Sequence, residues 1–153
     1  MLIFNKPALH AKIADFSHSI IDMGGIRRLL GGTWIYAAPE WEMAAPIAQL
    51  MTTDIYSYGL IFAGLILGLD LQQCIQRDPP FEPSMPIRQT VEKLRNEDHM
   101  RRYLMRQLQL VDQEDSDPDL AEFSVVHKIW ENTIQLNPGT RSLDEVVQLL
   151  GGR

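Results

Sequence analysis

The spacing of hydrophobic positions changes along the chain and divides it into two parts. In the second part, apolar side chains recur every three or four residues, as on one face of an α-helix. The helices expected from this pattern are Asp54–Leu69, Met85–Leu110, Leu120–Leu136 and Leu143–Leu150. The first part has no helical period and is expected to form short strands and loops. The pattern therefore predicts a mainly α-helical protein with a short β-hairpin at its start.

Turn residues separate the short elements of the first part. Leu2–Phe4 and Ala11–Phe16 are predicted to form a hairpin around a turn that contains a proline. The stretch Ser17–Ala38 holds two glycine pairs and no sustained period, so we expect a loop there. Pro39 is expected to open a short helix that reaches about Ala45, because proline is favoured at the first helical position.

Capping residues set the expected starts of two helices. Thr52 or Thr53 is predicted to cap the helix that begins at Asp54, because a hydroxyl can accept from the free backbone N–H groups there. Ser142 and Glu145 have the spacing of a capping box, which predicts the start of the last helix.

The apolar run between Asp54 and Asp70 is the longest in the chain. It is about 15 residues long, whereas a membrane-spanning helix needs about 20. We therefore expect a central helix that is buried on all sides. A membrane helix formed by Ile55–Leu69 stays open as an alternative, which solubility without detergent would test.

Composition and charge narrow the functional classes. The 153 residues, 45% hydrophobic and 22% charged, suit one globular domain or one lobe of a larger one. The net charge of −6 argues against nucleic acid or an anionic membrane as partner, because both attract a basic surface. Cys74 is the single cysteine, which fits a reducing, cytoplasmic compartment. No Cys/His cluster has metal-site spacing.

Four strings of the sequence, in this order, resemble the protein kinase superfamily. They are AKIADFS at 11–17, GGTWIYAAPEW at 31–41, TTDIYSYGLIFAGLILG at 52–68 and NPGTRSLDEVVQLL at 137–150. The first two resemble the DFG and APE ends of a kinase activation segment. The APEW string and the central helix look most like those of fungal serine/threonine kinases. The resemblance implies that residues 1–150 form part of a kinase domain, a C-lobe-like helical bundle with a short N-terminal β-hairpin.

The resemblance implies roles for two residues at the nucleotide side. Asp15 would hold Mg²⁺ against the phosphates of ATP, since a carboxylate is a hard oxygen ligand. Phe16 would pack beneath the nucleotide. Ser17 stands where the family has glycine. From the residues alone, Asp15 is equally a strand-end acid that caps a turn.

Four further residues would build the substrate side. Glu40 and Arg141 would form a buried bidentate ion pair that ties the end of the loop to the helical core. Thr33 corresponds to the threonine that touches the catalytic groups in serine/threonine kinases. Asp54 would anchor the catalytic loop, although from the residues alone it is equally an acid favoured by the helix dipole.

Other parts of a kinase are not found in these residues. Fourteen residues precede Asp15, and they hold no Gly-rich loop, strand lysine, helix glutamate or HRD catalytic loop. A truncated product and a start codon placed too late both fit this. We expect no appreciable transfer of the ATP γ-phosphoryl group to protein Ser or Thr hydroxyls by this chain alone, and no binding of ATP or Mg²⁺. The alternative is a non-catalytic, pseudokinase-like interaction module. The expected partner is a protein, either a substrate, another partner protein or a kinase N-lobe in trans.

Overall fold

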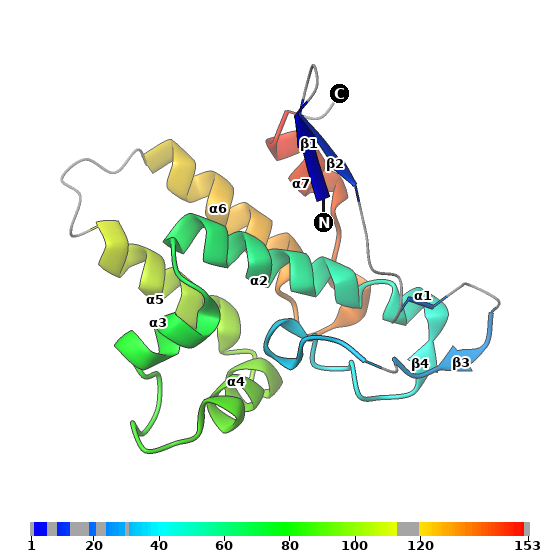
Figure 1. The fold of residues 1–153 in the computed structure, drawn as a ribbon, viewed down its shortest axis with the longest axis horizontal. Coiled ribbons are helices and arrows are strands. Elements are labelled where there is room, and N and C mark those ends of the chain that lie inside the picture. Colours follow the sequence, from blue (N-terminus) through cyan, green and yellow to red (C-terminus); the bar gives the residue numbers. More distant parts are fainter. Residues whose placement is uncertain are drawn as a thin grey trace.

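The computed structural model is mainly α-helical, with a two-stranded antiparallel hairpin at the N-terminus, as predicted (Figure 1). It describes residues 2–5, 9–12, 19–20, 24–29, 31–112 and 120–151. For 2–5, 9–12, 111–112 and 120–123 it describes the backbone alone. Helix α2 crosses the middle of the molecule, and α5 and α6 pack against it (Figure 1).

The N-terminal hairpin joins β1 (Leu2–Asn5) and β2 (Leu9–Lys12) in antiparallel register, with Phe4 opposite His10. The prediction of a hairpin is confirmed, but its second strand begins earlier than the predicted Ala11–Phe16. The rest of that predicted strand, from residue 13 onward, lies outside the described residues.

The segment before the helices differs from the prediction. The predicted loop Ser17–Ala38 contains strand β3 (Ile26–Arg27) and the 3-10 turn η1 (Trp34–Tyr36). Strand β3 (Ile26–Arg27) pairs with β4 (Ala45–Pro46), so the predicted helix from Pro39 to Ala45 is wrong. Two tight turns take its place, because the backbone N–H groups of Trp41 and Met43 donate to carbonyls three residues back. Proline at position 46 also disfavours the α conformation for the residue before it.

The central helix is α2 (Thr53–Leu67), which follows the short α1 (Ile47–Leu50). Its end at Gly68 has a physical reason, since that glycine adopts φ 63°, a left-handed conformation that stops a helix. Thr52 takes the predicted cap position, but its side chain makes no capping hydrogen bond. The hydroxyls of Thr52 and Thr53 instead donate to the carbonyls of residues 49 and 50.

The prediction that this helix is buried on all sides is also wrong. Its inner face is buried, but Ile61 is 58% exposed and Leu65 is 77% exposed. By length and composition alone, Ile47–Leu67 could cross a membrane, a test that the core helix of a soluble protein also passes. An exposed apolar face therefore runs along the outer side of α2.

Two helices replace the predicted continuous helix Met85–Leu110. Helix α4 (Ile87–Asn96) and helix α5 (Met100–Asp112) are separated at Asp98, which has φ 53°. Aspartate is one of the few residues that visit this left-handed conformation, so the chain turns there. Before them, α3 (Leu71–Arg77) was not predicted; the side chain of Asp70 caps it in a reciprocal box with Gln73.

The C-terminal part contains α6 (Leu120–Thr133), the 3-10 turn η2 (Pro138–Thr140) and α7 (Asp144–Leu149). Both helices were predicted, whereas the capping box was not formed. The Ser142 hydroxyl accepts from the N–H of Asp144, and Glu145 accepts from the side chain of Asn132 instead of closing the box.

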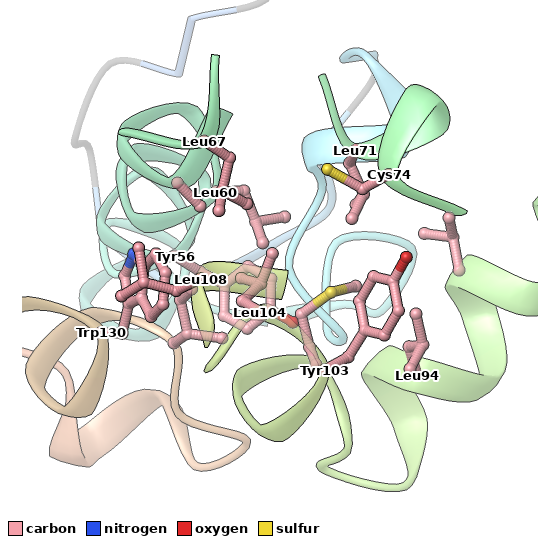
Figure 2. Close-up of a cluster of buried hydrophobic side chains, with 14 of the residues drawn as sticks. Tyr56, Leu60, Leu67, Leu71, Cys74, Leu94, Tyr103, Leu104, Leu108 and Trp130 are labelled. Atoms are coloured by element: carbon pink, nitrogen blue, oxygen red, sulfur yellow. The ribbon is translucent and has the colours of Figure 1, made fainter. Parts of the chain in front are cut away.

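The hydrophobic core lies where α2, α5 and α6 meet. Figure 2 shows the central cluster, in which Tyr56 and Leu60 of α2 lie near Leu104 and Leu108 of α5, with Trp130 of α6 beside them. All five side chains are at most 6% exposed. Burial of this apolar surface is the main source of stability for the helical bundle.

The bundle is also tied together by polar contacts at one residue after α3. The carboxylate of Asp78 accepts hydrogen bonds from Arg106 and Gln107, both at 2.8 Å, and its carbonyl accepts from the Tyr103 hydroxyl. Gln107 is fully buried and also accepts from Arg77. These bonds fix the end of α3 to one side of α5.

The close approach of the end of α6 to Gly59 of α2 gives a stability prediction. A Cβ added at Gly59 of α2 would lie 2.7 Å from Cγ1 of Ile134 and also too close to the Thr133 hydroxyl. Gly59→Ala should therefore lower the free energy of unfolding by about 1–3 kcal/mol, although alanine is the better helix former. Urea denaturation measures this.

Gly64 in the same helix is the matched control. A Cβ there would lie 3.3 Å from the carbonyl oxygen of Leu69 and 4.0 Å from Cα of Asp70, and it would meet no side chain. Gly64→Ala should cost much less, because the gain in helix propensity offsets a small shift. Equal midpoints for the two variants would show that α2 and α6 do not approach each other as described.

Candidate functional site

The segment from Gly31 to Trp41, which carries the GGTWIYAAPEW string, is held against the helical core. It includes the 3-10 turn η1 (Trp34–Tyr36), and Ala38 is fully buried. The Ser57 hydroxyl of α2 donates to the carbonyl of Tyr36 at 2.9 Å. Two buried arginines, Arg141 and Arg95, supply the other contacts.

The structure brings Glu40 and Arg141 together, although they are 101 positions apart. Two nitrogens of the guanidinium contact the two carboxylate oxygens: Nη1 donates to Oε1, and Nη2 donates to Oε2 at 2.9 Å. The side chains are 0% exposed for Arg141 and 3% exposed for Glu40. This is the bidentate geometry that makes an arginine–carboxylate pair strong and directional.

The remaining donors of Arg141 are used as well. Its Nε donates to the carbonyl of Gln135 at 2.9 Å, and Nη1 also donates to the carbonyl of Thr52 at 3.2 Å. The guanidinium lies 4.9 Å from the ring centre of Tyr56. Burial raises the pKa of Tyr56 far above its ordinary value, so this ring stays neutral beneath the cation. One side chain therefore joins the 31–41 segment, the start of α2 and the chain after α6.

Arg95 is a second buried cation, and the sequence analysis missed it. Its Nη1 donates to the carbonyl of Ala37 at 3.0 Å and to that of Trp34 at 3.3 Å. Nε has no hydrogen-bond partner in the described part of the chain. Burial lowers the pKa of Arg95 from its ordinary value. The signal was available, because Arg95 shares the inner helical face with Val91 at i−4.

A groove of about 540 Å³ opens beside this segment. Loop 31–38 and Trp41 form one wall, and α1 with the first half of α2 forms the other. Thr33 and Asp54, two of the predicted site residues, both line it and are both exposed. The predicted nucleotide-side residues Asp15 and Phe16 lie outside the described residues.

The described lining of the groove does not fit a nucleoside triphosphate. Asp54 is its single charged residue, and no lysine or arginine is among the described lining residues. A triphosphate needs cationic or backbone N–H donors, and a lone carboxylate repels it. Within the described ranges, no three His, Cys, Asp or Glu side chains gather where they could hold a metal ion.

Comparison with known proteins gives one partial similarity. A protein of Arabidopsis thaliana, the "G-type lectin S-receptor-like serine/threonine-protein kinase SD2-2", is 36% identical over 62 residues. The match covers 39% of this chain, and the chain spans about 8% of the length of that relative. No protein-family model and no solved structure matches. The similarity supports a relation to serine/threonine kinases over part of the chain, and the likeness to fungal kinases stays a prediction.

The buried ion pair gives the second prediction. Removing one partner leaves an uncompensated buried charge, so Arg141→Ala and Glu40→Ala should each cost about 3–5 kcal/mol of unfolding free energy. The double variant should cost far less than the sum, because neither charge is then left alone. Urea denaturation of the four proteins completes the cycle.

The exposed pair Arg88–Glu92 is the matched control, since its side chains are 62% and 40% exposed at a distance of 3.0 Å. Its coupling should be about 0.3–0.5 kcal/mol. If the coupling between Glu40 and Arg141 were no larger than in this control, the pair would not hold the segment in place.

Proposed function

We propose that residues 1–150 are the helical lobe of a serine/threonine-kinase-like domain and that the 31–41 segment is its platform for a protein substrate. One observation carries the proposal. The glutamate of the APE-like string and the arginine of the C-terminal string form a buried bidentate pair, Glu40–Arg141. The kinase resemblance implied this contact, and neither residue suggests it alone. The partial similarity to a plant serine/threonine kinase supports the same relation.

The family reaction is transfer of the ATP γ-phosphoryl group to a protein hydroxyl, and it depends on positioning and electrostatic stabilisation. Within this proposal, Asp15 is the residue that would hold Mg²⁺. The 153 residues contain no Gly-rich loop, strand lysine or catalytic-loop aspartate of the kinase type. We therefore propose that the chain alone is catalytically silent and that a second lobe would have to supply those groups.

A specific observation favours a second candidate, a non-catalytic interaction module in the cytoplasm. Met51, Ile61 and Leu65 are 64%, 58% and 77% exposed, and all three lie on α2 or just before it. Exposed aliphatic side chains that follow one helix mark a surface suited to a protein partner.

A measurement of nucleotide binding tests the proposal that the chain alone is catalytically silent. Isothermal titration calorimetry with ATP and Mg²⁺ should give no heat of binding at micromolar concentrations, because the phosphate-binding lysine is absent. Asp15→Ala should leave this result unchanged. Micromolar binding that Asp15→Ala abolishes would contradict the proposal.

A second experiment tests whether the chain is the lobe of a kinase-like domain. A serine/threonine kinase fragment that spans the N-lobe and the catalytic loop, added in trans, should bind the chain and restore phosphate transfer to a protein substrate. Asp15→Ala should keep that association but lose the transfer. If the lobe fragment did not bind at all, the kinase-lobe assignment would fail.

A further inference from the structure

We propose that the groove beside α2 is a docking site for a segment of another protein in which an arginine is flanked by aliphatic side chains. The inference rests on the proposed role of the 31–41 segment as a platform for a protein partner, because that segment forms one wall of the groove. It is supported by an exposed carboxylate without a partner in the described part of the chain and by the apolar side chains that line the same groove.

Two of the hydroxyls that line the groove are already bonded to backbone carbonyls. The Thr53 hydroxyl donates to the carbonyl of Leu50 at 2.6 Å, and the Ser57 hydroxyl donates to carbonyls of Tyr36 and Thr53. The single proton of each hydroxyl is already used, so these groups can offer a guest only neutral acceptor oxygens, which bind a cation less strongly than a carboxylate does.

The Asp54 carboxylate is the one charged group among the described lining residues. It is exposed, and it has no hydrogen-bond or ion-pair partner among the described residues. No described cation lines the groove to balance its charge. The groove therefore offers one strong polar contact, and that contact calls for a cation. Arginine suits it better than lysine, since its planar fork can bond both carboxylate oxygens.

Apolar side chains line the same groove as this carboxylate. Trp41, Ile47 and Leu50 line the walls, and the exposed Met51 and Ile61 line the same groove. Ile61 follows Asp54 by seven residues, two turns along one face of the helix, or about 10 Å at 1.5 Å per residue. A protein segment with aliphatic side chains on both sides of its arginine could contact the apolar side chains while the arginine contacts the carboxylate.

A protein segment fits the groove better than a membrane surface does. The groove is concave, and its volume of about 540 Å³ lies within the usual range of ligand sites, about 300–1,000 Å³. The exposed carboxylate at Asp54 and the net charge of −6 would oppose contact with an anionic bilayer.

The probe is a soluble synthetic peptide with one arginine between two pairs of leucines, and its partner peptide has glutamate in place of the arginine. Calorimetry and amide chemical-shift mapping on the full chain measure binding. The arginine peptide should bind with Kd below about 1 mM and should shift the amides of Thr33, Trp41 and Ile61. Binding should weaken as salt is added, and the glutamate peptide should not bind.

Variants on the exposed groove surface separate charge from apolar contact. Asp54→Asn should weaken binding about five- to tenfold and remove its salt dependence, and Ile61→Ala should weaken it by a similar factor. The matched controls, Asp144→Asn and Val147→Ala, lie on α7 away from the groove and should have no effect.

Three results would overturn the proposal. They are no binding of the arginine peptide at 1 mM, binding that Asp54→Asn leaves unchanged, and amide shifts that map elsewhere. Binding of the chain to neutral lipid vesicles through Ile61 and Leu65, without peptide binding, would assign this face to a membrane instead.

Discussion

The Glu40–Arg141 ion pair is the constraint on which the candidate site depends. Taking two charges out of water costs several kcal/mol for each, so such a pair is stable only with good geometry and further hydrogen bonds. Both conditions are met here: the contact is bidentate, and Arg141 also donates to the carbonyl of Thr52, just before α2, and to that of Gln135, after α6. The pair therefore fixes where the 31–41 segment lies more than it adds to overall stability.

The second buried cation, Arg95, completes this arrangement. It bonds only carbonyl oxygens of the segment, Trp34 and Ala37, and forms no ion pair among the described residues. The backbone of η1 is thus held by α4, while Glu40 is held from the chain before α7. With one wall fixed in this way, the groove keeps its shape, and Asp54 and Ile61 on the α2 wall are exposed to a partner.

Helices could be predicted from the sequence where burial imposes a period, and α2, α6 and α7 were found in this way. The prediction failed where local conformation decides the outcome. The left-handed Asp98 breaks one amphipathic pattern into α4 and α5, and the contacts of Glu40 override the helix signal of Pro39. At the site, the pairing of Glu40 with Arg141 followed only from the family resemblance, because nothing in a local pattern links residues so far apart. Arg95 was overlooked although its position on the inner face of its helix was readable.

Amide hydrogen exchange in the Arg141→Lys variant tests the central claim most directly. Lysine keeps the positive charge but cannot form the bidentate contact of a guanidinium. We therefore expect the 31–41 segment to loosen while the helical bundle stays intact. The amides of Tyr36, Trp41 and Met43, which bond within this segment, should exchange faster, and that of Leu104 in α5 should not change. Unchanged protection of the segment, or equal loss of protection in both regions, would contradict the account.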